Sequence, residues 1–444
     1  VLAGPRRDIL ALLEASPMEP LPLTRAEFLR LVALTALAVP PLRLGARGRG
    51  QVRDPGARAS TDEMARVIAT YDGQGLHRTG TDVDRASGEW LLEEARRRGA
   101  TVSLETFTLQ RFDPVVAALR VGDRRIDGLP LFDGGTTEPA GISGRLGDDA
   151  SGAPLVLTRL DAPGISTEGR ALEPLRRAEH VRGIVAVTAG TQPGLSPSNA
   201  ARFTSPYGAP VLQVGSEHET WLRERAAAAA EATLIVQVTR TAATATNVVA
   251  FVEGRDTTLE PLYVITPRSG WWRCASERGG GIACWLEVMA ALGAAAPSRR
   301  AVFIASSGHE LGHLGLDAAI AARPGSVPGA AAWMHLGANI GAAGGRSRLQ
   351  TSDDAIEALA VSAFDRAGAV VAERVARGTV PAGEARNIHV GGGRYISLLG
   401  SGPYFHNIAD RWPVAVDVDA VARFARALAA CAVRLASGTQ GRGA

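Results

Sequence analysis

The chain of 444 residues contains no lysine, and all 48 of its basic residues are arginines. Without lysine the protein cannot form Schiff bases through its side chains, and it cannot supply the lysine of a phosphate-binding loop. Cysteine is also scarce, because Cys274, Cys284 and Cys431 are the only three and none shows CxxC spacing. They are too few for a disulfide framework and form no cysteine-based metal motif.

The charge and the aromatic content narrow the classes of partner. The formal net charge is only +3, aromatic residues make up 5% of the chain, and no basic cluster is interleaved with aromatics. Such a composition argues against nucleic acid as a partner. A hydrophobic share of 46% with 21% charged residues is ordinary for a globular protein, and 444 residues suffice for two or three domains.

Residues 1–57 hold two short helical patterns and an Arg/Gly-rich linker, and they permit two interpretations. The segment 24–39 resembles a twin-arginine export signal, although Ala26 stands where the second arginine belongs. Alternatively, the segment is a helix with a Thr24/Glu27 capping box that ends before Pro40. The composition suggests a bacterial source, so we expect a location in the bacterial cytoplasm or export through this signal. The apolar run falls far short of the ~20 residues that cross a bilayer, so we expect no transmembrane anchor.

Helix and strand patterns become regular from residue 60 and predict the domain organisation. Two helices and a strand are followed by short strands and turns at 127–243, and then by strands alternating with helices to residue 436. The predicted strands include residues 101–110, 233–238, 247–252, 262–266 and 301–306. This order predicts a mixed α/β sheet sandwiched by helices, formed by 58–126 and 244–436, with an inserted domain at 127–243 and a tail at 437–444.

The most informative motif follows the apolar run that begins at Ala301. The run ends at Gly308 and is followed by His309, Glu310 and His313. As a His-Glu-x-x-His helix, the segment would be a zinc-protease signature with both imidazoles on one face and Glu310 as the base. As Ser-Gly-x-Glu-x-Gly, it would be a loop after a strand, with Glu310 itself as a metal ligand. Polar groups where a strand ends are typical of active sites in open α/β sheets.

The order of these landmarks resembles the co-catalytic zinc aminopeptidase and glutaminyl cyclase superfamily, over residues 60–436. More specifically, it resembles members that carry an inserted, β-rich protease-associated domain, which 127–243 would then be. The family's first landmark, a His-x-Asp ligand pair, is replaced by 267–272, which contain neither residue type, and Ala338 replaces a later ligand aspartate. Its bridging aspartate corresponds to Glu277, and its Gly-Glu-Glu-x-Gly motif keeps the ligand as Glu310 but has His309 in place of the base.

The resemblance implies a site for one zinc ion instead of two. The surviving ligands would be Glu277, Glu310 and His406, with Asp410 orienting the second nitrogen of His406 and His309 acting as the base. Three protein ligands with an open position describe a catalytic zinc centre. Each residue also has a structural interpretation, because Glu310 fits a helix cap, Glu277 a solvated turn and His406 a buried histidine. We interpret His313 and His335 as structural.

The predicted substrate pocket uses Arg268, Trp271, Trp272 and Tyr395. An arginine beside tryptophans suits a carboxylate or an aromatic group, although the same residues would also simply fill an abandoned metal cavity. The sequence therefore predicts a one-metal hydrolase or acyl-transfer enzyme that acts on a small peptide-like or amide substrate. The alternative is a non-catalytic aminopeptidase-fold protein that has lost the di-zinc centre. The residues do not indicate an oligomeric state.

Overall fold

The structure, a computed structural model, describes residues 60–437. The predicted export signal at 24–39 and the tail beyond residue 437 lie outside the described residues. Within 60–437, no helix has both the length and the hydropathy needed to cross a membrane. All the described residues belong to one compact unit.

Within residues 60–437, twelve strands follow one another in the hydrogen-bonded order β13-β12-β14-β11-β9-β10-β8-β4-β5-β6-β7-β3. Two more strands lie off this path, with β1 paired to β8 and β2 paired to β1. The centre of the sheet is the set of four parallel strands β10, β9, β11 and β14, flanked by antiparallel β8 and β12. The predicted mixed sheet is therefore confirmed. The bounds of these strands are Glu231–Val252 (β8), Leu262–Pro267 (β9), Ala301–Ser306 (β10), Ala332–Leu336 (β11), Arg346–Thr351 (β12), Glu373–Arg374 (β13) and Tyr395–Ser401 (β14).

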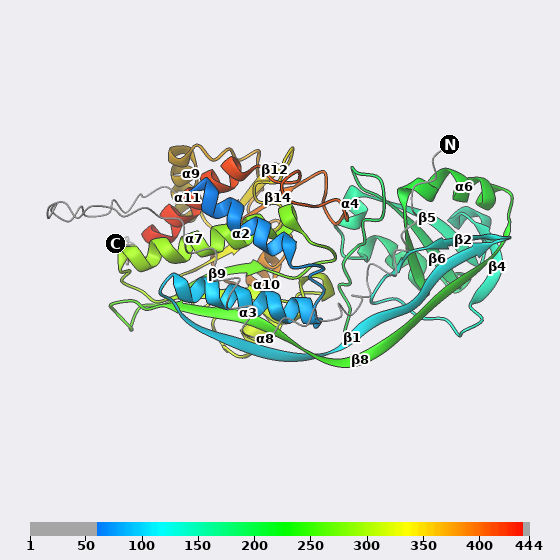
Figure 1. The fold of residues 1–444 in the computed structure, drawn as a ribbon, viewed down its shortest axis with the longest axis horizontal. Helices are drawn as coiled ribbons and strands as arrows, with labels where there is room; N and C mark the ends of the chain where they lie inside the picture. Colours follow the sequence, from blue (N-terminus) through cyan, green and yellow to red (C-terminus); the bar gives the residue numbers. More distant parts are fainter. Residues whose placement is uncertain (1–59, 438–444) are drawn as a thin grey trace, which may run out of the picture. The chain divides into compact units, whose positions relative to one another are not determined.

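Helices cover both faces of the parallel strands (Figure 1). On one face α7 packs on β9, β10 and β11 and is itself covered by α2 and α11, while α9 packs on α11. On the other face α8 packs on β10 and α10 on β14. Strands covered on both faces must be apolar throughout, which is why β9 and β10 read as continuous apolar runs. The helices are Thr61–Gly73 (α2), Asp82–Arg97 (α3), Gly280–Ala295 (α7), Leu314–Ala321 (α8), Asp354–Ala367 (α9), Ala385–Val390 (α10) and Val418–Ala436 (α11).

Three of these helices begin at a capping side chain that the sequence supplies. Thr81 accepts from the N–H of Asp84 at the start of α3, Asp353 from that of Ile356 at α9, and Asp417 from that of Ala420 at α11. Each cap satisfies one backbone donor that the first turn leaves unpaired. Short polar side chains therefore determine where these helices start.

A long antiparallel ribbon connects the parallel core with the strands β4 to β7. It consists of β1, Thr101–Val121, paired with β8 along almost its whole length, with a bulge between Pro114 and Val116. The sequence predicted a strand at 101–110 and two separate strands at 233–238 and 247–252, and this division is wrong. No glycine or proline interrupts 231–252, so the chain continues as one strand through the polar, small residues between the two apolar runs.

The segment 124–230, between β1 and β8, has its own strands and its own apolar cores. The parallel strands β4, β5, β6 and β7 pair in that order, and β3 pairs antiparallel with β7. Two clusters of buried residues, centred on Val185 and on Ile184, fill opposite faces of β6. The assignment of 127–243 as a protease-associated domain stays a prediction. The elements are Arg124–Asp127 (β2), Leu129–Pro130 (β3), Ile142–Gly147 (β4), Leu155–Asp161 (β5), Ala162–Ile165 (α4), Glu173–Arg177 (α5), Gly183–Ala189 (β6), Val211–Gly215 (β7) and Glu219–Ala227 (α6).

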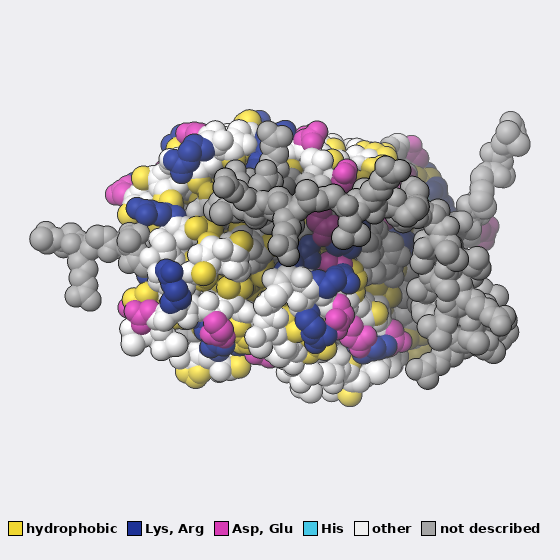
Figure 2. Space-filling model, turned by 60° about the vertical axis from the view of Figure 1, so that its left-hand side comes forward, with side chains coloured by type: hydrophobic (Ala, Val, Ile, Leu, Met, Phe, Trp, Pro, Cys, Tyr) yellow, Lys and Arg dark blue, Asp and Glu magenta, His cyan; other side chains and the backbone are white. Residues whose placement is uncertain are grey.

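The surface charge follows the composition. On the described part of the face seen in Figure 2, arginines and acidic side chains are interspersed among uncharged groups. This face therefore carries no extended field of one sign that would steer a highly charged partner.

Candidate functional site

The candidate site lies where the carboxyl ends of the parallel strands meet. The loops after β9, β10 and β14 carry Trp271, Glu310 and His406, and the loop after β11 carries Asn339. Four non-glycine residues in these segments have left-handed backbone, namely Cys274 (φ 54°), His313 (φ 68°), Asn339 (φ 59°) and His406 (φ 56°). Such conformations cost about 1–3 kcal/mol each and concentrate at functional sites. The position of these loops and their strained backbone therefore both indicate a functional site at this edge of the sheet.

Glu277 and His406 are brought together as predicted neighbours. Glu277 lies in a single π-helical turn, Ala275–Gly279 (η4), that leads into α7, and its side chain is fully buried. Its Oε1 atom is 3.3 Å from His406 Nε2. The carbonyl oxygen of Pro197 lies 2.6 Å from His406 Nδ1, the contact that holds the ring.

Arg278 contacts the Glu277 carboxylate of this pair. Its guanidinium is fully buried, and Nη2 lies 2.6 Å from Glu277 Oε1. Burial by itself raises the pKa of Glu277, but the positive charge of Arg278, together with the charge and the close contact of His406, outweighs it and the net shift is downward. Likewise burial lowers the pKa of Arg278, and the negative charge of Glu277, together with smaller contributions that include Glu310, makes the net shift upward. The chain thus places its own cation against the carboxylate that was predicted to bind zinc.

Glu310 has a different set of partners. Thr79 donates to Glu310 Oε1 from both its backbone N–H (3.0 Å) and its hydroxyl (2.6 Å), and the Ser269 hydroxyl donates to Oε2 (2.6 Å). Glu310 is 2% exposed. Both carboxylate oxygens are therefore engaged in tying the loops after β9 and β10 to the segment before α3.

The backbone around Glu310 excludes the helical interpretation of the motif. His309, Glu310 and Leu311 form one 3-10 turn between two left-handed glycines, Gly308 (φ 81°) and Gly312 (φ 80°). Because His313 is left-handed as well, the chain is not α-helical from His309 to His313. The helical His-Glu-x-x-His interpretation is wrong, and the loop interpretation describes the backbone.

Asp410 caps the start of the π-helical turn. The backbone N–H groups of Ser276 and Glu277 donate to its two oxygens, at 2.7 and 3.0 Å. The orientation of His406, which was assigned to Asp410 from sequence, falls instead to the Pro197 carbonyl. Burial raises the pKa of Asp410 to about 7, and the charge of Glu277 acts in the same direction.

His309 belongs to a second group of buried polar side chains. Its Nδ1 is 3.7 Å from Glu384 Oε1, which accepts from the Ser306 hydroxyl at 2.6 Å. His335 Nδ1 contacts the Ser397 hydroxyl at 2.9 Å. Burial lowers the pKa of His309 far below its usual range and that of His335 to about 4. Burial therefore disfavours the protonated form of both rings and makes each a weaker proton acceptor than a solvated imidazole.

The residues predicted for the substrate pocket are all buried. Arg268 forms an ion pair of 2.8 Å with Asp84, and the indole N–H groups of Trp271 and Trp272 donate to Asn199 Oδ1 (2.8 Å) and His406 O (2.7 Å). Tyr395 lies at the amino end of β14, opposite the end that leads to His406. The structure groups the two tryptophans with the candidate site and separates Tyr395 from them.

Two members of the site were missed from sequence. Arg278 had a detectable signal, because an arginine directly follows the carboxylate that stands at the family's bridging position. Glu384 had none, since it follows a Pro-Ala-Gly turn far along the chain and enters the site only through folding. Neither residue belongs to a sequence pattern that marks a catalytic base or a metal ligand.

The donor set does not fit the zinc ion that the fold family implies. The two carboxylate oxygens of Glu277 and the Nε2 atom of His406 form no hydrogen bond. Donor atoms left free in this way would suit a metal ion. However, Glu310 is turned to Thr79 and Ser269, and the Arg278 guanidinium lies against Glu277. Within 60–437 no group of three or more His, Cys, Asp and Glu side chains is arranged to hold a metal ion. The three-ligand set stays a prediction.

Comparison with known proteins identifies the fold. The chain matches no protein-family model and no curated protein. It is similar in structure to a zinc aminopeptidase from Bacillus subtilis, with 14% identity, 84% of this chain and 94% of that chain covered, and a TM-score of 0.64. A peptidase M28 precursor from Shewanella amazonensis matches with 16% identity, 86% and 96% coverage and a TM-score of 0.68. An aminopeptidase from Aneurinibacillus matches with 14% identity, 86% and 95% coverage and a TM-score of 0.63. The chain therefore has the fold of the zinc aminopeptidases.

Proposed function

We propose that this chain is a non-catalytic protein of the aminopeptidase fold, in which an internal ion pair has replaced the metal centre and which acts as a binding module. The observation that carries the proposal is the contact of 2.6 Å between Arg278 Nη2 and Glu277 Oε1. A cation in this position satisfies the charge of the carboxylate that a metal would otherwise neutralise. A metal ion would have to displace this guanidinium, which is fully buried.

Glu310 supports the same proposal. A zinc-binding carboxylate must direct an oxygen at the ion, whereas three donors from Thr79 and Ser269 occupy both oxygens of Glu310. Turning this side chain toward a metal would leave those buried donors unpaired, at a cost of about 1–3 kcal/mol for each group. The carboxylate is therefore explained by its structural contacts.

A specific observation favours a second candidate, the one-metal hydrolase or acyl-transfer enzyme for a peptide-like or amide substrate. Glu277 Oε1 and His406 Nε2 are 3.3 Å apart and neither forms a hydrogen bond, although the Arg278 guanidinium lies beside Oε1; this separation suits two donors to one ion. Glu277 and His406 would hold zinc, which would supply Lewis-acid chemistry. His309 would be the proton acceptor, and it would act against the burial that lowers its pKa.

Metal content separates the two candidates. Protein purified without a tag should contain no stoichiometric zinc by mass spectrometry, and added zinc should leave its melting temperature unchanged. The matched variants are Glu277→Gln, which removes a predicted ligand, and Glu357→Gln, which changes a glutamate on α9 outside the site. About one zinc per chain that disappears in Glu277→Gln but not in Glu357→Gln would refute the non-catalytic proposal.

Activity is the second readout. Aminoacyl, peptide and cyclisation substrates should give no turnover above that of a Glu310→Gln variant. Turnover that is lost in this variant while its unfolding curve stays close to that of the wild type would establish the enzyme instead.

A further inference from the structure

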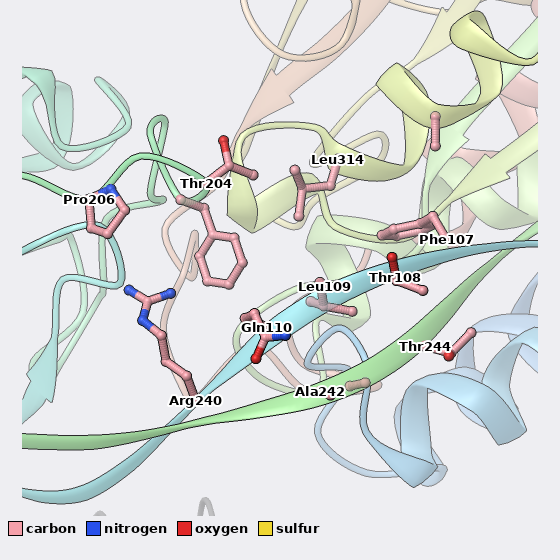
Figure 3. Close-up of a pocket in the computed structure, with 13 residues that line it drawn as sticks. Phe107, Thr108, Leu109, Gln110, Thr204, Pro206, Arg240, Ala242, Thr244 and Leu314 are labelled. Atoms are coloured by element: carbon pink, nitrogen blue, oxygen red, sulfur yellow. The ribbon is translucent and has the colours of Figure 1, made fainter.

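A cavity of about 860 Å³ lies outside the candidate site, along the ribbon of β1 and β8 (Figure 3). It is bounded by the ribbon, by the segment 203–206 and by the first turns of α8. Its volume lies within the range of about 300–1,000 Å³ that is typical of small-molecule sites. None of the residues predicted for the candidate site lines it.

The walls of the cavity are mainly apolar. Eight of its 13 lining residues are apolar, including Phe107, Leu109, Phe203 and Leu314, and four others are uncharged threonine or glutamine. Arg240 is the single charged residue among them, so the lining holds one positive charge and no negative one. An apolar wall with one convergent polar group is the usual composition of a ligand site.

Arg240 is positioned by aromatic rings. It lies opposite Phe112 in the ribbon, and its guanidinium lies 5.1 Å from the centre of the Phe112 ring and 5.9 Å from that of Phe203. Figure 3 shows its side chain extending from β8 toward Pro206. The nearby carboxylate of Asp113 is paired with Arg111 at 2.8 Å. Within residues 60–437, Arg240 forms no ion pair with a carboxylate.

We propose that this cavity binds a monocarboxylate with a linear hydrocarbon chain of medium length, its carboxylate on Arg240 and its chain along the ribbon. The charge of the lining selects an anion, because the arginine lacks a carboxylate and a guanidinium pairs well with one. The length follows from β8, where the four residue steps from Arg240 to Thr244 extend about 13 Å at ~3.3 Å per step. The apolar side chains of Phe107, Leu109 and Leu314 would cover the hydrocarbon.

Isothermal titration calorimetry tests the proposal with decanoate, decanol and decylamine, each below its micelle-forming concentration. The wild-type protein should bind decanoate with one site per chain, bind decanol more weakly, and bind decylamine least. The variant Arg240→Met should weaken decanoate binding about tenfold and leave decanol binding unchanged, since a charged hydrogen bond is lost and the apolar wall stays. The control Arg145→Met removes an exposed arginine of β4 and should change neither affinity.

A second variant tests the place of the ligand independently of charge. Ala242→Phe introduces a large side chain from an exposed lining position, so it should abolish binding of decanoate and decanol alike while the unfolding curve stays close to that of the wild type. The proposal is overturned if the wild type binds no decanoate, if decylamine binds as tightly as decanoate, or if either lining variant binds decanoate as the wild type does.

Discussion

Replacement of Arg278 by methionine tests the proposed ion pair most directly. The variant keeps an unbranched side chain of similar length but leaves the carboxylate of Glu277 buried without its cation. It also loses the hydrogen bond of 2.7 Å that Arg278 Nε donates to the Ser269 carbonyl. We expect the variant to fold with lower stability, and the size of the loss follows from the ways in which Glu277 can respond.

The simplest response of Glu277 is to bind a proton. Its ordinary pKa is 4.5, so protonation at pH 7 costs 7 − 4.5 = 2.5 pH units, or about 3 kcal/mol at 1.36 kcal/mol per unit. The lost hydrogen bond adds about 1 kcal/mol. The sum of about 4 kcal/mol agrees with the ~3–5 kcal/mol typical of breaking a buried ion pair.

The pH dependence distinguishes this mechanism from a simple loss of packing. In the wild type the pKa of Glu277 is lowered, so its contribution to stability is present above pH 4.5 and is lost as the pH falls. In Arg278→Met, burial without the cation raises this pKa, so stability is full below pH 4.5 and is lost as the pH rises. The difference in unfolding free energy between the two proteins should therefore shrink by about 1.4 kcal/mol for each pH unit from 7 toward 5.

Urea unfolding at pH 5, 6 and 7, followed by circular dichroism, measures this difference. The control Arg85→Met removes an exposed arginine from its ion pair with Glu89 and should cost less than about 1 kcal/mol at every pH. A loss in Arg278→Met that is below 1 kcal/mol, or one that does not change with pH, would refute the reasoning.

Three further predictions concern the surroundings of the site and the fold. Glu310→Ala should lower the unfolding free energy by about 3–5 kcal/mol, because three buried donors lose their acceptor; a loss below 1 kcal/mol in urea would contradict a structural role. His77→Phe should keep the ring stacked on Tyr71, at 3.8 Å, and remove a group whose pKa burial lowers to about 3. The wild type should then lose up to about 1.4 kcal/mol per pH unit relative to this variant as the pH falls from 6.5 to 3, as acid titrations of stability would show. Asp417→Ala should cost about 1 kcal/mol in thermal or urea unfolding through the lost cap of α11, and Asp417→Asn should recover most of it.

The parallel strands were predictable because their environment leaves a simple pattern. β9 and β10 are covered by helices on both faces, so every side chain is buried and the runs at 262–266 and 301–306 are visible in the sequence. The ribbon left a weaker pattern. The two ends of β8 contribute to different apolar cores, and the side chains in its middle are exposed or half-buried. The sequence of β8 therefore resembled two short strands.

The candidate site was predictable only in part. Glu277 and His406 stand at positions that the aminopeptidase pattern marks, and the fold brings them within 3.3 Å. The contacts of Glu310 were not predictable, since its donors Thr79 and Ser269 lie 231 and 41 residues away. The sequence around a glutamate that follows a strand is the same whether its carboxylate binds a metal ion or accepts hydrogen bonds from two hydroxyl groups.

The sequence by itself determined which chemical groups are absent. Residues 267–272 contain neither His nor Asp, and Ala338 has no ligand atom, so these positions cannot supply an imidazole or a carboxylate to a metal ion. The tertiary structure decided what the remaining groups do. It placed the Arg278 guanidinium on Glu277 and the Pro197 carbonyl, 209 residues away, on His406. The partner of a buried charge is set by the elements that pack around it, and this packing exists only in the folded chain.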